Sequence, residues 1–223
     1  MEGNEVTQRD LNTDAGSLRA QILRQASELF ARAGYHQTSS AEIAAASGIP
    51  ISVLFHHFAS KVEIMNTILK HDLGAAVAAA ERQLTRTGSP ATRLYDYLVE
   101  DIGTACQSSY AVGVNATSGL LRELDFAGAR ARSQRLSDAR VAIIEEGIEV
   151  GEFVEVDPQS ASRTIEWTIE GALIELDTDR EDDPEAFARE VAGFCLRALV
   201  VDSDTFDRIR RESGACPGED RSS

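Results

Sequence analysis

Apolar residues recur every three or four positions along most of this chain, which is the spacing of one face of an α-helix. The clearest stripe lies within residues 17–33, where Ile22, Ala26 and Phe30 share one side and Gly34 follows the last apolar position. Alternation of the kind that marks a half-buried strand does not occur over a useful length, and the 223 residues include only 5 prolines. The pattern predicts an all-α protein of about nine helices.

Capping boxes mark where two of the first helices begin. Ser39 and Glu42 have the Ser-x-x-Glu spacing, in which the hydroxyl caps an amide of the first turn and the carboxylate reaches back. The same spacing recurs at residues 60–63. These signals predict short helices over residues 39–47 and 51–58 and a long helix over residues 61–84.

The rest of the chain predicts five more helices. Asp157 and Asp183 are each followed by proline, which is a strong start signal because proline needs no amide partner in the first turn. Residues 153–156 are expected to form a short extended link. The expected helices cover residues 90–109, 111–124, 127–151, 158–176 and 184–201.

Charge is distributed unevenly along the chain. The net charge is -15, yet residues 17–61 hold four Lys or Arg and two Glu, so this segment alone is positive. The acidic remainder disfavours a membrane surface or a large polyanion as its partner. No apolar run is long enough to span a bilayer and the first residues are polar, so we expect no export signal and a cytoplasmic location. Three widely spaced cysteines exclude a disulfide framework.

Candidate catalytic chemistry is sparse. The sequence holds no glycine-rich phosphate loop, no nucleophile elbow and no Cys–His pair at catalytic spacing. His56 and His57 are neighbours on an expected helix, so their side chains diverge by about 100° and would not chelate one metal ion. We therefore expect no catalytic residue, no cofactor and no metal site.

Two of the short helices are joined by Gly48-Ile49-Pro50. A tight turn between two such helices, the second of which can enter a major groove of DNA, is the arrangement of a helix-turn-helix. From spacing alone, a three-helix cap on a helical bundle fits equally well and would have no DNA role.

Several short motifs follow one another between residues 18 and 65. They are Ala26-Ser27-Glu28-Leu29-Phe30 with Gly34-Tyr35, Thr38-Ser39, Ile43-Ala44, Gly48-Ile49, Leu54-Phe55-His56-His57-Phe58 and Ser60-Lys61. In this order and at this spacing they resemble the TetR family of bacterial transcriptional regulators. The resemblance implies a ligand-responsive DNA-binding regulator rather than an enzyme. It implies a homodimeric repressor that leaves a palindromic double-stranded operator when a small-molecule effector binds its C-terminal domain.

The resemblance implies a set of DNA contacts. Hydroxyls at a helix N-terminus suit a phosphate oxygen, and a lysine at the start of the long helix would add a positive contact. Phe55 stands where the family usually has tyrosine, so its ring is kept and the phosphate-binding hydroxyl is lost. With few polar groups on this helix, contact with thymine methyl groups or reading of DNA shape is expected. The implied DNA-binding residues are Thr38, Ser39, Ser40, Ile51, Ser52, Val53, Phe55, His56 and Lys61.

The resemblance also implies an effector pocket among the middle helices and a dimer interface on the last two long helices. The alternative for each apolar stripe is that it faces the core of its own protomer. The candidate pocket residues are Tyr95, Leu98, Tyr110, Leu121, Leu124, Phe126 and Trp167. The candidate interface residues are Gly171, Ile174, Ala188, Val191 and Phe194.

These expectations divide the chain into four segments. Residues 1–16 form a disordered arm, 17–62 a helix-turn-helix domain, 63–202 a helical ligand-binding and dimerisation domain, and 203–223 a disordered tail. Two alternatives of other classes stay open: a helical small-molecule carrier or enzyme without a DNA role, and a structural helical adaptor.

Overall fold

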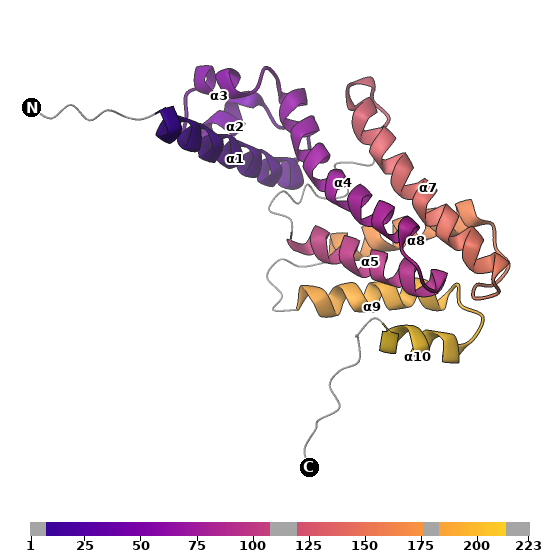
Figure 1. Ribbon diagram of the computed structural model, residues 1–223. Helices are drawn as coiled ribbons and strands as arrows, with labels where there is room; N and C mark the ends of the chain where they lie inside the picture. The colour runs from indigo at the N-terminus through magenta and orange to yellow at the C-terminus, as the bar shows by residue number, and fades with distance from the viewer. Residues whose placement is uncertain (1–7, 108–119, 176–182, 213–223) are drawn as a thin grey trace, which may run out of the picture. The chain divides into compact units, whose positions relative to one another are not determined.

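Helices account for nearly all of the residues that the computed structural model describes, which are 8–107, 120–175 and 183–212 (Figure 1). They are α1 (Gln8–Ala33), α2 (Ser40–Ala46), α3 (Ile51–His57), α4 (Lys61–Thr85), α5 (Pro90–Gln107), the 3-10 turn η1 (Leu124–Phe126), α7 (Ala127–Glu149), α8 (Pro158–Glu175), α9 (Pro184–Arg197) and α10 (Ser203–Glu212). The prediction of an all-α fold is confirmed. The helix expected over residues 111–124 lies mostly outside the described residues.

The chain separates into two compact units, which we describe one at a time. Unit 1 comprises residues 1–71 and 109–129, and unit 2 comprises residues 72–108 and 130–223. Helix α4 begins in unit 1 and ends in unit 2.

The core of unit 1 is built from one apolar face of each of its helices. The predicted stripe of α1 is buried, and α2 packs against both α1 and α3. The first part of α4 contributes four buried side chains on the 3–4-residue spacing of a helix face, namely Ile64, Met65, Ile68 and Leu69. The largest buried side chains of this core include Ile22, Phe30, Ile43, Leu54, Phe58, Ile64, Met65, Ile68 and Phe126.

The predicted helix starts in unit 1 are well supported by hydrogen bonds. Ser39 caps α2 as a full capping box with Glu42, which confirms that prediction. At the start of α4 the box is shifted. The Glu63 amide donates to the Ser60 hydroxyl at 3.2 Å, but the Glu63 carboxylate accepts from the Ala59 amide at 2.7 Å rather than from Ser60.

The expected disordered arm differs from the structure over its second half. Helix α1 begins at Gln8 instead of near residue 17. Residues 8–16 contain no proline, and each residue added to an existing helix gains a backbone hydrogen bond without a new nucleation cost. A helix can therefore extend through polar residues that show no apolar stripe.

The core of unit 2 lies around α5, which packs along α9 and also contacts α8 and α10. Figure 1 shows α5 and α9 running side by side, with α10 beside α9. The core includes Leu94, Tyr97, Leu98 and Ile102 of α5, so its predicted stripe faces inward. Asp157 and Asp183 accept hydrogen bonds from first-turn amides of α8 and α9, as their positions before proline predict.

The C-terminal part of unit 2 departs from the sequence prediction in two ways. Helix α9 ends at Arg197 rather than near 201, because Val200 pairs with Phe153 in an antiparallel bridge. The Val154 amide donates to the Leu199 carbonyl at 2.8 Å, which fixes that pairing. The chain then forms α10 where a disordered tail was expected, and Phe206 and Ile209 of this helix are buried in the core. Two apolar residues three apart suffice to bury one face of a short helix.

Phe153 is itself packed against a glycine. Its ring covers the backbone of Gly147 in α7 so closely that a methyl group at Gly147 would overlap ring atoms. Gly151, between them, adopts a φ of 76°, which is unfavourable for residues with a side chain.

Within residues 8–107, 120–175 and 183–212, none of the helices has the length and apolar character that a bilayer-spanning segment needs.

One carboxylate joins three parts of unit 2. Glu152 accepts from the Ser89 hydroxyl at 2.5 Å and the Ala91 amide at 3.0 Å, both at the start of α5, and from Arg208 of α10 at 2.8 Å. Burial alone would raise the pKa of Glu152, but the Ser89, Ala91 and Arg208 donors together hold it below its usual value.

We predict that Glu152→Gln lowers the free energy of unfolding by about 1–3 kcal/mol at neutral pH, because the amide replaces a charge-assisted acceptor. Since the folded pKa is lowered, the carboxylate stabilises the fold above its unfolded pKa, and this contribution is lost as the pH falls through the folded value. The difference between the variant and the wild type should therefore shrink below about pH 4. Urea unfolding at both pH values measures it. Glu155→Gln, at an exposed position on the same link, is the control. An unchanged difference at acid pH would contradict the prediction.

Candidate nucleic-acid interface

The turn between α2 and α3 fixes which face of α3 points outward. Gly48 adopts a φ of 68°, and the Ile49 amide donates back to the Ala44 carbonyl at 3.0 Å. This closes α2 and directs the chain into α3 after Pro50. Leu54 and Phe58 are then buried, so the opposite face of α3 is left at the surface.

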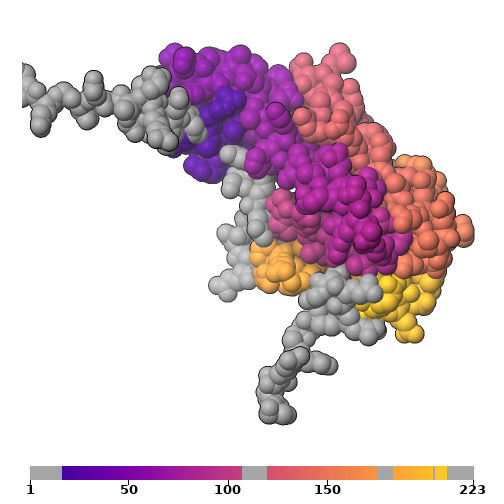
Figure 2. All heavy atoms as spheres, in the orientation of Figure 1, coloured from indigo at the N-terminus to yellow at the C-terminus, as the bar shows by residue number. Residues whose placement is uncertain are grey.

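That outward face carries two apolar and two polar side chains. Ile51 and Phe55 are 45% and 47% exposed, and they lie one turn apart. Ser52 and His56 are also exposed and form the parallel row, while Val53 is half-buried. The purple atoms at the upper edge of Figure 2 belong to this part of the chain. A hydroxyl and an imidazole can exchange hydrogen bonds with base edges, and the apolar pair can contact methyl groups.

The end of α3 is held by an arginine from α1. The Arg19 guanidinium donates to the His57 carbonyl at 2.5 Å and stacks 3.9 Å from the centre of the Phe58 ring. It also lies 3.7 Å from the Glu63 carboxylate. A cation is favourable here because the last carbonyls of a helix carry partial negative charge.

Lys61, the first residue of α4, holds the chain just before α2. Its ammonium donates to the Tyr35 carbonyl at 2.7 Å and to the Thr38 carbonyl at 2.8 Å, and it lies 4.3 Å from the centre of the Tyr35 ring. Burial lowers the pKa of Lys61, although the Glu42 carboxylate acts in the other direction. The residue predicted to contact a phosphate thus already has two protein acceptors, and its phosphate contact stays a prediction.

The three predicted hydroxyls at the start of α2 also differ in their surroundings. Thr38 is buried and donates to the Gly34 carbonyl at 2.8 Å, so it is withdrawn from the surface where a phosphate contact was predicted. Ser39 is exposed, but its hydroxyl donates to Glu42 at 2.8 Å. The Ser39 amide and hydroxyl hold the pKa of Glu42 below its usual value. Ser40 is half-buried as the first residue of α2.

The predicted pocket residues that the structure describes are divided between the two units. Tyr95 and Leu98 are fully packed in unit 2, whereas Phe126 is packed in unit 1 and Leu121 is half-buried there. Leu124 and Trp167 are 89% and 62% exposed. The sequence did not indicate this exposure, because the helical period marks an apolar face without saying what covers it. Tyr110 lies outside the described residues.

Four of the five predicted interface residues lie at or near the surface of α8 and α9. Ile174 and Phe194 are 46% and 66% exposed, Gly171 is exposed and Val191 is half-buried. Ala188 is the exception: it is fully buried in the core of its own unit, so a direct contact with a second chain is excluded.

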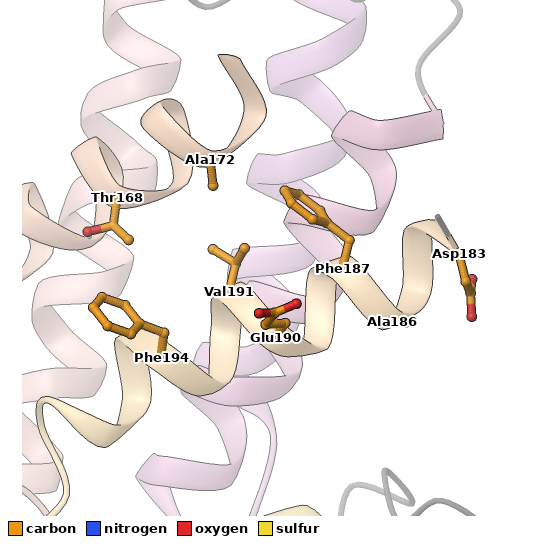
Figure 3. A pocket seen from close by; sticks show the side chains of 8 residues that line it. All are labelled: Thr168, Ala172, Asp183, Ala186, Phe187, Glu190, Val191 and Phe194. Atoms are coloured by element: carbon orange, nitrogen blue, oxygen red, sulfur yellow. The ribbon is translucent and has the colours of Figure 1, made fainter. Parts of the chain in front are cut away.

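An open groove of about 570 Å³ runs along this surface (Figure 3). Figure 3 shows Val191 and Phe194 of α9 beside Thr168 and Ala172 of α8, and the groove also borders Phe187. Several apolar side chains are therefore accessible on one face of this helix pair.

A buried polar network in unit 2 has no counterpart in the sequence prediction. Arg140 of α7 donates to Ser162 at 3.1 Å and to Glu166 at 2.9 Å, both on α8, and to the Tyr97 hydroxyl at 3.4 Å. That hydroxyl donates to Asp101 at 3.4 Å, and burial raises the pKa of Asp101 to about 6. The signal in the sequence that could have indicated this network is an arginine placed close to apolar residues such as Ala139 and Ile143.

Comparison with known proteins identifies the α1–α4 segment. Residues 22–68 match the sequence profile of bacterial regulatory proteins of the tetR family. The HTH-type transcriptional regulator UidR of Escherichia coli strain K12 is 33% identical over 95 residues, which is 42% of this chain. This match spans 45% of UidR, so the chain covers less than half the length of that curated relative.

Solved structures extend the likeness to most of the fold. AmtR of Mycobacterium smegmatis superposes with a TM-score of 0.75 and 26% identity, covering 88% of this chain and 92% of AmtR. AibR, solved in complex with isovaleryl coenzyme A and operator DNA, has a TM-score of 0.68 and 20% identity, covering 79% and 97%. The helix order, the motif-bearing N-terminal helices and these matches agree, and the chain belongs to the TetR family of bacterial transcriptional regulators.

Proposed function

We propose that this protein is a transcriptional regulator that binds a palindromic operator in double-stranded DNA as a homodimer. The observation that carries the proposal is the outward face of α3, where Ser52 and His56 stand beside Ile51 and Phe55 while Leu54 is buried. One helix of seven residues makes few contacts, so two copies spaced by one DNA turn, roughly 34–36 Å, are needed for tight binding. Its place of action would be the bacterial cytoplasm.

The surface of α8 and α9 supports the homodimer. Trp167, Ile174 and Phe194 are large apolar side chains that remain exposed in the single chain, and Phe194 also lines the groove. An exposed apolar surface of this kind is typical of a protein–protein contact. In a two-fold dimer the same patch of each copy would cover the other.

We assign repression as the sense of regulation, relieved when a small molecule binds unit 2. AibR has the same fold and was solved with both isovaleryl coenzyme A and operator DNA, so this fold can accommodate both kinds of partner. A coupling of about 1–3 kcal/mol between the two sites would lower operator affinity by about 5–150-fold.

The hydrogen bonds of two cations in unit 1 favour an apolar rather than an ionic contribution to DNA binding. Arg19 and Lys61 each bind backbone carbonyls of the protein, so the positive charge of residues 17–61 is partly committed to internal contacts. Apolar contacts from Ile51 and Phe55 would then contribute much of the specific affinity, through thymine methyl groups.

A mobility-shift assay with the DNA upstream of the protein's own gene tests the proposal. At low salt the wild type should retard this fragment and not a scrambled duplex of equal length. Because non-specific binding also grows at low salt, the difference between the two duplexes is the informative quantity. No retardation of either duplex would favour a carrier or enzyme without a DNA role.

We predict that Ile51→Ala weakens operator binding by about 5- to 30-fold, because three carbon atoms that would be buried against DNA are removed. Protein stability should change little, since Ile51 is 45% exposed. Fluorescence anisotropy with labelled operator measures the affinity. Val150→Ala, another exposed apolar position, is the matched control. Equal affinity of Ile51→Ala and wild type would contradict an apolar readout by α3.

We predict that Lys61→Met lowers the free energy of unfolding by about 1–3 kcal/mol, because the Tyr35 and Thr38 carbonyls lose their donor. The slope of log affinity against log salt should stay at the wild-type value. A phosphate contact by Lys61 would instead reduce that slope by about 0.9 per protomer. Lys70→Met, an exposed lysine further along α4, serves as the control.

A further inference from the structure

A short segment distant in sequence from the DNA-binding helices packs within unit 1. Residues 120–126 follow α5 and precede α7, and Leu120 and Phe126 of this segment are buried. Leu124, between them, is 89% exposed. The segment is therefore attached through particular side chains rather than along its whole length.

Three contacts attach the segment to residues of α4 and of the loop between α1 and α2. The His36 imidazole lies 2.9 Å from the Glu123 carboxylate, and the Asn66 amide donates to the Asp125 carbonyl at 3.0 Å. The Phe126 ring meets the Tyr35 ring edge-on, at 5.5 Å between centroids and 86° between planes. An edge-to-face aromatic pair has a preferred geometry, so it fixes orientation as well as burying area.

Tyr35 links Phe126 to the start of α2. The Tyr35 ring packs against Phe30 at 5.3 Å on one side and receives the Lys61 ammonium on its face. The same ammonium binds the Tyr35 and Thr38 carbonyls, directly before the Ser39 cap. A displacement of Phe126 would therefore move the ring that positions Lys61, and with it the first turn of α2.

Phe126 immediately precedes a helix that begins in unit 1 and continues into unit 2. It is followed at once by Ala127, the first residue of α7. Leu136, Ile143 and Ile144 of that helix are buried in the unit 2 core. The chain therefore reaches the unit 2 core within ten residues of Phe126.

We infer that Phe126 is a positioning residue for the DNA-binding helices, acting through Tyr35 and Lys61 on α2. This inference rests on the proposed function, because its readout is operator affinity. The contrasting role for Phe126 is simple core filling, in which the ring contributes burial but not the orientation of α2. The two roles differ in what a leucine at this position would do.

The test compares Phe126→Leu, which keeps an apolar side chain and removes the ring, with Leu124→Ala, which changes an exposed neighbour. The first measurement is amide hydrogen exchange without DNA. Phe126→Leu should speed exchange of the Glu42 and Ile43 amides, the first turn of α2, by about tenfold, with no change at α5 in unit 2. Leu124→Ala should match the wild type throughout.

The second measurement is affinity for the operator fragment and for the scrambled duplex. Phe126→Leu should weaken operator binding by about three- to thirtyfold and leave binding to the scrambled duplex unchanged. The losses of operator affinity caused by His36→Ala and by Glu123→Ala should not add in the double variant, because these two residues attach the same segment through one contact.

Two outcomes would overturn the inference. One is a lower melting temperature of Phe126→Leu with unchanged exchange at α2 and unchanged operator affinity, which is the result of core filling. The other is faster exchange spread evenly over unit 1. If the wild type binds no duplex at all, the proposed function fails, whereas the exchange measurement still decides whether Phe126 positions α2.

Discussion

Two cations that bind backbone carbonyls hold the helices on which the DNA-binding proposal depends. Helices α2 and α3 have seven residues each, a length at which an isolated helix in water does not form. Arg19 binds the last carbonyl of α3, and Lys61 binds two carbonyls just ahead of α2. Both cations come from the longer helices α1 and α4. The orientation of α3 is thus set from outside α3.

The same contacts change the meaning of the charge pattern. A positive segment within an acidic chain suggests a surface for phosphate, yet two of its four cations bind protein carbonyls. Ile51 and Phe55 are two of the four side chains on the exposed face of α3, where polar residues would read bases directly. The positive local charge of residues 17–61 therefore indicates where along the chain this surface lies, but it does not describe how the surface would bind DNA.

Local signals in the sequence predicted most of the helices and several of their ends. The Ser39 capping box and the Asp183–Pro184 start need only neighbouring residues, and both occur as predicted. Contacts between distant residues were not predictable: nothing near Lys61 indicates that the Thr38 carbonyl lies 2.8 Å away. The early end of α9 has the same origin, because it depends on pairing with Phe153, far back in the sequence. Periodicity likewise grouped Trp167 with apolar residues without telling which surface, if any, covers it.

The contact between Phe153 and Gly147 constrains how this chain can diverge. Any side chain at Gly147 would occupy space that the ring fills, so the glycine can be replaced only after Phe153 has become smaller. The reverse order would pass through an overpacked intermediate, which costs stability at that step. Among homologues, the identity of one position should therefore depend on the other, and a smaller residue at Phe153 should precede any departure from glycine.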